Sequence, residues 1–177
     1  MLELEYEFRE DDLVNFNEAQ YLNSKDVQSQ LNKNRWIVPS IMVLVGTFYY
    51  YYYGDIKSAA YIGVVAVLWA LLSTKVMLYD MRRQVLKQYS EKEKKAMFGT
   101  YTLTIDPANP AYLFETSPSG KNKMAWQELV RVEYGKRYVY IFITLSTALV
   151  IPLETVKKGD LEKFAEQAEK MIERYAG

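Results

Sequence analysis

Two uncharged, strongly apolar stretches stand almost back to back in this chain: WIVPSIMVLVGTFYYYYYG (residues 36–54) and SAAYIGVVAVLWALLST (residues 58–74). A helix needs about 20 apolar residues to cross the hydrocarbon of a bilayer, which is roughly 30 Å thick. Lipid offers no partners for backbone hydrogen bonds, so a spanning segment must be helical or part of a closed barrel. The two stretches therefore predict a transmembrane helical hairpin over residues 36–79, with its second span extended to 58–78.

The alternative interpretation is that both stretches are buried core helices of a soluble protein. Two adjacent helices that are apolar on every side would leave little amphipathic cover in a chain of 177 residues. We also expect no cleaved signal peptide here, because roughly 35 mostly polar residues precede the first stretch. The membrane hairpin is the better prediction.

Aromatic and basic residues mark the ends of the predicted spans. Tyrosine and tryptophan prefer the headgroup level of a membrane, and a lysine near a helix end can extend its ammonium group toward the same level. A run of aromatic residues can also stack on a ligand or partner, but anchoring is the simpler interpretation. The predicted interface anchors are Trp36, Tyr49, Tyr50, Tyr51, Tyr52, Tyr53 and Lys75.

Small residues recur along the second apolar stretch at steps of four, three and four. This spacing places them on one stripe of a helix, where small side chains let two helix backbones approach closely. The stripe predicts packing against the first span of the same hairpin, or against a second copy of the chain. Its members are Ala59, Gly63, Ala66 and Ala70.

The distribution of basic residues predicts the orientation of the hairpin. Positive residues are retained on the cytoplasmic side, and the turn between the stretches holds only Lys57. Both termini are therefore expected in the cytoplasm. The basic residues outside the turn are Lys25, Lys33 and Arg35 before the first span, and Lys75, Arg82, Arg83 and Lys87 after the second.

Composition restricts the possible chemistry. The chain has 22 basic and 22 acidic residues, and it lacks both cysteine and histidine. A net-neutral chain without a dominant basic domain is not typical of nucleic-acid binding. Thiolate chemistry is excluded, and so is the commonest general base and metal ligand. The acidic pair Asp11 and Asp12 is expected at a solvated helix start. We therefore expect no enzyme activity, no cofactor and no metal site.

Polar helices are predicted on both sides of the hairpin. Residues 10–35 have the pattern of a mostly polar cytosolic helix that leads into the first span. Residues 80–98 contain no proline or glycine, so the second span is expected to continue as a cytosolic helix to about Phe98.

From Gly99 the pattern changes from helical to alternating, as in half-buried strands. Turn residues separate successive short runs, and Pro152 and Gly159 are expected to close the strand series. An amphipathic helix then follows Asp160. Residues 99–177 therefore predict a small antiparallel β-barrel or sandwich with a covering helix, with the strands expected at 101–106, 111–116, 124–126, 129–134, 138–145 and 148–151.

The first nine residues also alternate, with Leu2, Leu4, Tyr6 and Phe8 between acidic residues. An isolated strand does not persist, so residues 1–9 are expected to pair with an edge of the C-terminal sheet. Trp126 is expected to anchor the core of that sheet. The predicted fold class is an α+β membrane protein, with a two-helix transmembrane hairpin and a small cytosolic β domain.

Several of these segments resemble the YcxB-like family of bacterial membrane proteins. The resemblance rests on the hairpin, on the final helix, and on the segments LEYEFRE (4–10), AWQELVRV (125–132), YVYI (138–141) and LVIPL (149–153). It implies that the C-terminal part is similar to a bacterial pleckstrin-homology-like domain. It also implies a multi-pass protein of the bacterial cytoplasmic membrane, and it assigns no activity.

The function expected from these features is a non-enzymatic interaction module at the inner membrane. Its partners would be the bilayer and a protein or lipid headgroup, and a second copy of the chain is a further possibility. The candidate anion contacts are the turn residues Lys121, Lys123, Lys136 and Arg137. The alternative function is an immunity protein that neutralises a membrane-targeting toxin. A solvated surface is the competing interpretation of the four basic residues.

Overall fold

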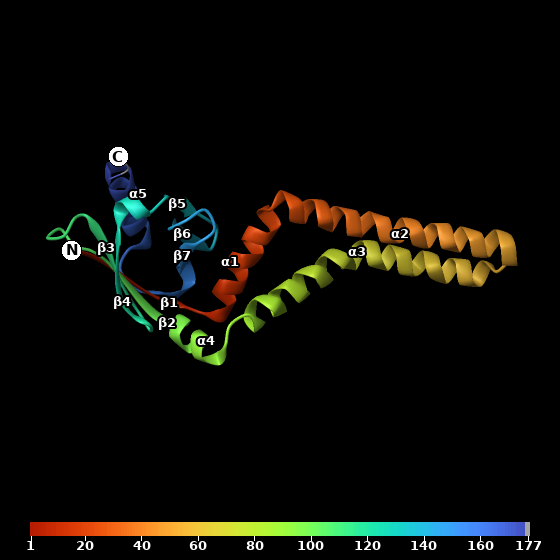
Figure 1. Cartoon of the computed structure of the whole chain (residues 1–177), viewed down its shortest axis with the longest axis horizontal. Coiled ribbons are helices and arrows are strands. Elements are labelled where there is room, and N and C mark those ends of the chain that lie inside the picture. Colours follow the sequence, from red (N-terminus) through yellow and green to blue (C-terminus); the bar gives the residue numbers. More distant parts are fainter. Residues whose placement is uncertain (176–177) are drawn as a thin grey trace. The chain divides into compact units, whose positions relative to one another are not determined.

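The computed structural model describes residues 1–175, which form two compact units (Figure 1). The β unit contains Met1–Phe16 and the chain from Leu86 onward. The helical unit contains Asn17–Val85. Helix α1 (Glu10–Asn23) begins in the first unit and ends in the second.

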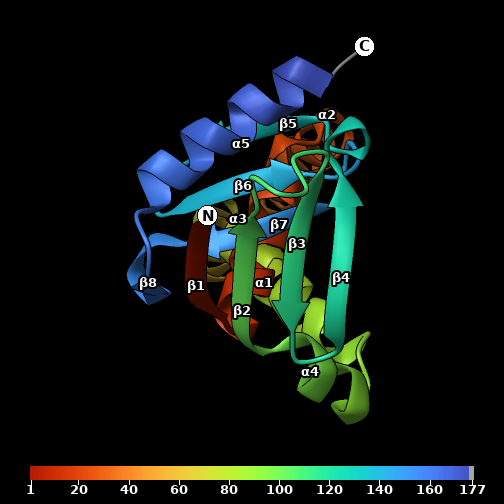
Figure 2. The same ribbon diagram turned by 90° about the vertical axis from the view of Figure 1, so that its left-hand side faces the viewer.

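The β unit is built on a five-stranded antiparallel sheet with the order β4-β3-β2-β1-β8 (Figure 2). The N-terminal strand β1 pairs with this sheet, as its alternating side chains led us to expect. It does not lie at an edge, however, because β2 pairs with one of its sides and β8 with the other. Its register with β2 runs from Leu2 opposite Ile105 to Phe8 opposite Gly99. The strands are β1 (Leu2–Phe8), β2 (Gly99–Ile105), β3 (Tyr112–Ser117), β4 (Gly120–Ala125) and β8 (Val156–Lys158).

A second, three-stranded antiparallel sheet has the order β5-β6-β7. The final helix α5 (Leu161–Tyr175) packs against β5, β1 and the short 3-10 turn η1 (Trp126–Glu128). Trp126 is fully buried in this core. The strands are β5 (Arg131–Tyr134), β6 (Tyr138–Phe142) and β7 (Ala148–Pro152), and a second 3-10 turn, η2 (Leu153–Thr155), follows them.

The strand series differs from the prediction in several places. The strand expected at 124–126 begins at Gly120, within the predicted turn, and the strand expected at 138–145 ends at Phe142. Pro152 does not close it, because the chain turns through η2 and forms β8, a three-residue edge strand beside β1. Such a strand has one apolar residue, Val156, and no alternation to detect. Trp126 lies after β4 in η1 and not in a strand.

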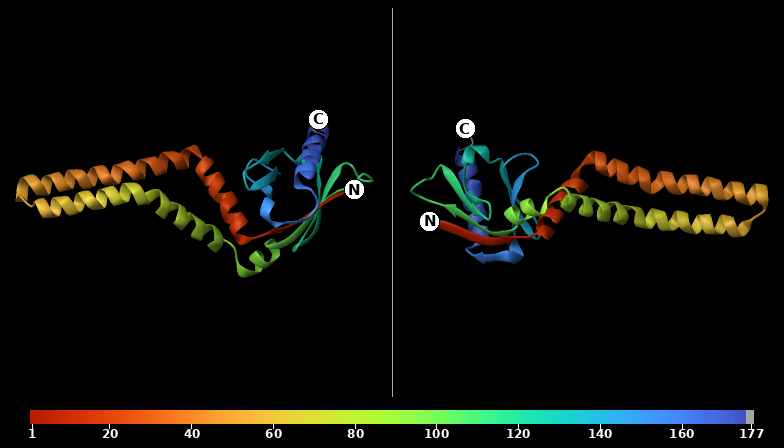
Figure 3. Two further views of the ribbon diagram at one scale, coloured as in Figure 1. Left: turned by 180° about the vertical axis from the view of Figure 1, so that it is seen from behind. Right: turned by 60° about the horizontal axis from the view of Figure 1, so that its bottom comes forward.

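The helical unit consists mainly of two antiparallel helices, α2 (Lys25–Tyr53) and α3 (Ile56–Lys87), which lie side by side in both views of Figure 3. Gly54 ends α2 in the left-handed conformation, with φ at 65°. The carboxylate of Asp55 accepts hydrogen bonds from the backbone of Lys57 and Ser58 and so caps α3. The turn is therefore shorter than predicted, since the helix begins at Ile56.

Two predicted helices are interrupted in the structure. The helix expected over 10–35 breaks at Ser24, whose backbone is extended, so that α1 and α2 are separate. The helix expected to reach Phe98 ends at Lys87, and Ser90 starts α4 (Glu91–Met97). Ser90 and Glu93 cap α4 reciprocally, a capping box that stabilises a new helix start over continuation of the old helix.

Within residues 1–175, α3 is the one helix long and apolar enough to cross a membrane. Only 11% of its most apolar stretch is buried. The first predicted span lies in α2, which is not such a helix by length and composition. Its final turn is five tyrosines, Tyr49–Tyr53, whose hydroxyl groups lower its hydropathy. The predicted pair of spans is thus supported for one helix of the hairpin.

Candidate functional site

A groove of about 780 Å³ lies in the β unit, where the first turns of α5 approach β5, β6 and η2. Its apolar part comes from aliphatic side chains on both sides, and four carboxylate side chains stand around it. We call it the α5 groove. The described residues that line it are Tyr134, Gly135, Val139, Leu153, Val156, Asp160, Leu161, Glu162, Glu166 and Glu169.

The helical repeat of α5 explains why acidic side chains line this groove. Its buried face carries apolar residues such as Phe164, Ala168 and Met171. The glutamates follow at steps of four, three and four along the neighbouring face, and three of them reach the groove. The spacing was visible in the sequence, and it is the signal by which this site could have been found. The stripe is Glu162, Glu166, Glu169 and Glu173.

Contacts with β1 fix the point at which α5 begins. Asp160 accepts a hydrogen bond from the backbone nitrogen of Lys163 at 3.2 Å and so caps the helix. Gly159, just before it, has φ at +94°, and a Cβ there would lie 2.3 Å from the carbonyl oxygen of Glu3. Only glycine fits so close to the β1 backbone. The acidic first turn of α5 is therefore held in place by the N-terminal strand.

Tyr134 lies close enough to the carboxylates of the groove for their negative charges to affect its phenol. Its side chain is 52% exposed, and its hydroxyl donates to an oxygen of Glu169 at 3.4 Å. The pKa of Tyr134 is raised, first by partial burial and then by the charges of Glu169, Glu166 and Glu162. The phenol thus senses a negative field. The side chains that line the groove include no lysine or arginine.

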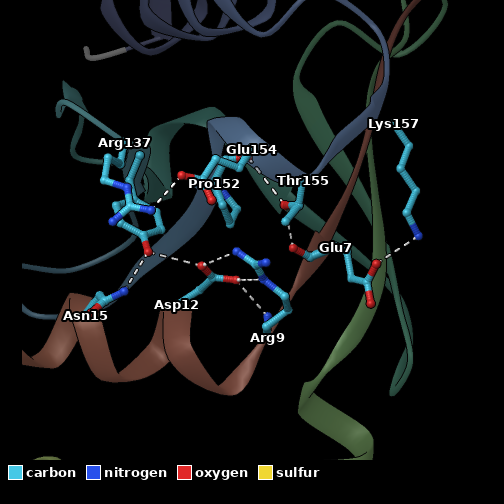
Figure 4. A network of polar contacts seen from close by, with 10 residues as sticks. Glu7, Arg9, Asp12, Asn15, Arg137, Pro152, Glu154, Thr155 and Lys157 are labelled. Carbon is cyan, nitrogen blue, oxygen red and sulfur yellow. Dashed lines mark hydrogen bonds and ion pairs between the residues drawn. The ribbon is translucent and has the colours of Figure 1, made fainter.

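A second polar cluster surrounds Asp12, near the start of α1 (Figure 4). Asp12 is fully buried, whereas the side chain of Arg9 is 46% exposed. The carboxylate accepts from the backbone nitrogen of Arg9 at 2.9 Å and from its Nε at 3.1 Å. The hydroxyl of Tyr138 donates to the other oxygen at 3.1 Å, and Asn15 donates to that hydroxyl at 2.9 Å.

This cluster fixes the beginning of α1 to strand β6. The bond from Asp12 to the Arg9 backbone caps the helix, and the bond from Tyr138 crosses to the three-stranded sheet. The hydrogen bond to Asp12 is also the main reason that the pKa of Arg9 is raised. Asp11, the neighbouring acid, is exposed. Of the two neighbouring acids, Asp11 is therefore solvated, whereas Asp12 is buried in a cluster that stabilises the fold.

The four basic residues predicted as anion contacts lie as two pairs, one on strand β4 and one in the turn before β6. Lys121 and Lys123 share one face of β4, the edge strand of the larger sheet, where lysines discourage edge-to-edge pairing. The ammonium group of Lys123 lies 5.0 Å from the centre of the Tyr112 ring. Lys136 and Arg137 lie in the turn before β6, and Arg137 pairs with Glu154 at 2.6 Å. The structure does not bring the two pairs into one patch.

The predicted interface anchors lie exposed on α2 and α3. Trp36 stands near one end of the hairpin, where the indole nitrogen of Trp69 donates to the backbone oxygen of Asn34 at 3.3 Å. The tyrosines form a ring cluster with Phe48 at the other end, in which Phe48 and Tyr52 stack at 5.3 Å. The exposed anchors are Trp36, Tyr49, Tyr50, Tyr51, Tyr52, Tyr53 and Lys75.

Of the predicted packing stripe, Ala66 is buried, and Ala59, Gly63 and Ala70 are half-buried. A different glycine faces the partner helix. A Cβ on Gly46 of α2 would lie 3.4 Å from the side chain of Ile62 and 3.6 Å from the carbonyl oxygen of Ala59. A Cβ on Gly63 would meet nothing within 4 Å. Of these two glycines, Gly46 is therefore the one packed against the partner helix.

The part of the chain that contains the α5 groove is the part that resembles known proteins. Residues 109–168 match the model of the YcxB-like protein family. The match confirms the predicted resemblance over these residues, which run from just before β3 to the middle of α5. Nine of the ten groove-lining residues fall within this YcxB-like segment, and Glu169 is the next residue after it.

No curated protein and no solved structure matches the chain. The pleckstrin-homology-like assignment implied by the resemblance therefore stays a prediction. The architecture it refers to, antiparallel strands followed by a covering helix, is present in the β unit. Within residues 1–175, no group of three or more acidic side chains is placed to hold a metal ion.

Proposed function

We propose that the protein is a non-enzymatic interaction module anchored in a membrane by the hairpin of α2 and α3, with the β unit on the cytoplasmic side. The observation that carries the proposal is the surface of α3. This helix of 32 residues contains a long apolar stretch, yet only 11% of that stretch is buried. An apolar surface of that extent is stable in lipid and costly in water.

Helix α2 is proposed to cross together with α3. The two helices contact each other at two levels. Trp69 of α3 lies beside Asn34 of α2, and Gly46 of α2 lies beside Ala59 and Ile62 of α3. The outward side chains of α2 are also large, apolar and exposed. The five tyrosines lower its hydropathy, but they would lie at the headgroup level, where tyrosine is favoured. The exposed apolar residues include Ile37, Ile41, Val43, Leu44 and Phe48.

The basic residues beside the spans support a cytoplasmic location for both termini. The geometry of the β unit supports binding over catalysis. The fully buried carboxylate of Asp12 makes hydrogen bonds that cap α1 and connect it to β6, so its role is structural. The α5 groove, of about 780 Å³, is a surface that a partner could occupy.

Site-specific labelling tests this topology. The chain has no cysteine, so a single introduced thiol gives an unambiguous signal. Asp55→Cys in the hairpin turn should react with an impermeant maleimide added to intact cells. Ser119→Cys in the turn before β4 should react only after the cells are permeabilised. Labelling of Ser119→Cys but not of Asp55→Cys in intact cells would show the opposite topology. Recovery of the protein in the soluble fraction would show that the hairpin is not a membrane anchor.

The immunity function has one observation in its favour, the exposed cluster of Phe48 and the tyrosines at the end of the hairpin. Such a cluster would face the outer side of the membrane, where a toxin could contact it. Anchoring accounts for the same residues, so toxin neutralisation stays a prediction.

A further inference from the structure

We propose that the α5 groove binds a basic, amphipathic segment of a partner protein, with an apolar side chain in the groove and lysine or arginine side chains against the glutamates. The chemistry that fits is the cytoplasmic flank of another membrane protein. This inference rests on the proposed function, because the membrane anchor places the groove among such flanks.

The first argument is the apolar surface that the groove leaves accessible. Leu153 is 47% exposed although it follows directly after the buried strand β7. The ring of Tyr134 stands exposed on the β5 side, and Val156 is half-buried below. Covering these side chains with an apolar group would remove apolar surface from water, which favours binding. The volume of about 780 Å³ is within the range of ligand pockets.

The second argument is charge complementarity. The groove carries Asp160 and three glutamates. Among residues 1–175, the one ion pair given to these carboxylates is that of Asp160 with Lys163, at 3.2 Å. The raised pKa of Tyr134 is consistent with the same negative field. Interfaces are arranged so that opposite potentials meet, which increases the association rate and excludes partners of like charge.

The same charges decide between the two kinds of partner expected from the sequence. The cytoplasmic leaflet carries anionic lipid and a negative surface potential. A groove edged by glutamates repels such headgroups, so a lipid headgroup is the wrong occupant. Membrane proteins instead concentrate lysine and arginine in their cytoplasmic flanks, next to the apolar ends of their spans. The apolar residues of such a segment therefore match the aliphatic lining of the groove, and its basic residues match the carboxylates around it.

Direct binding to the detergent-solubilised full chain tests the proposal. The probe is a fluorescent amphipathic peptide of leucine and lysine, and its counterpart has glutamate in place of each lysine. The lysine peptide should bind, the glutamate peptide should not, and binding should weaken as salt is raised. Equal binding of both peptides would overturn the charge argument, and so would binding of short-chain anionic lipid in place of the lysine peptide.

Matched variants assign the binding to the groove. Glu166→Lys should lower the affinity for the lysine peptide by about fivefold. Glu173→Lys, on the same helix but outside the groove, should change that affinity by less than about twofold. Leu153→Ser should weaken binding at every salt concentration, and Leu145→Ser, at an exposed residue that does not line the groove, should not. Equal effects within either pair would refute the site. Because these measurements use protein in detergent, they can fail while the labelled topology holds, and the topology can fail while they succeed.

Discussion

Replacing Asp12 by asparagine is expected to destabilise the β unit, because this carboxylate is fully buried among donors. Asparagine has nearly the same shape, but it carries one acceptor oxygen in place of two. With this oxygen toward Tyr138, its amide nitrogen would face the backbone nitrogen and Nε of Arg9, and with the amide turned over, the hydroxyl of Tyr138 would lose its acceptor. In either orientation the variant loses one of these hydrogen bonds and the ion pair with the guanidinium group, while it keeps the packing.

The magnitude follows from these contacts. Loss of one of these hydrogen bonds, the helix cap or the bond from Tyr138, costs about 1 kcal/mol. The ion pair contributes at most about 1 kcal/mol, since Arg9 is 46% exposed and water can replace its partner. Asp12→Asn should therefore lower the free energy of unfolding by about 2 kcal/mol. Asp12→Ala removes both hydrogen bonds and the ion pair, and should cost about 3 kcal/mol.

The assay is urea unfolding of the full chain in detergent, followed by the emission of Trp126. Trp36→Phe and Trp69→Phe in the background leave Trp126, in the core of the β unit, as the one tryptophan. Asp11→Asn is the matched control, because Asp11 is exposed and contributes only about 0.5 kcal/mol through the helix dipole. If Asp12→Asn costs no more than Asp11→Asn, the buried network does not stabilise the fold as described.

Two further predictions concern packing and pH. Gly46→Leu should push α2 away from Ile62 and lower the thermal stability of the hairpin in detergent, whereas Gly63→Leu should be tolerated, and the reverse order would contradict the packing. Burial, with a contribution from Glu115, raises the pKa of Tyr101 to about 12. A raised pKa means that the folded state holds the proton more tightly, so stability should be constant below about pH 10 and fall between about pH 10 and pH 12. Tyr101→Phe should reduce that loss when unfolding is measured across this range, and an unchanged loss would rule out the tyrosine as its source.

The sequence alone predicted the elements whose patterns are local. The alternation in Leu2, Leu4, Tyr6 and Phe8 has the period of a strand, and the apolar positions of α5 have the period of a helix. Such periods follow from backbone geometry and do not depend on the rest of the fold. The two uncharged stretches likewise predicted long helices and a turn.

Local signals were also present where the prediction failed. Ser90 and Glu93 have the spacing of a capping box, which ends the expected helix continuation before Phe98. The glutamates of α5 recur at helical steps, but only the fold shows that they stand beside an apolar groove. The sequence contained both patterns, but the structural role of each depended on which other elements pack beside it.

Tertiary structure decided the features that join distant residues. Asp11 and Asp12 are chemically identical neighbours, yet only Asp12 turns toward Tyr138, 126 positions along the chain. β8 exists because β1 offers it an edge, and Gly159 is required because a Cβ at this position would collide with the carbonyl oxygen of Glu3. The α5 groove has the same origin, since it combines Tyr134, Leu153 and Glu166 from different elements. A local period fixes the face on which a side chain lies, whereas burial, pairing and charge environment depend on contacts between segments that the chain order does not specify.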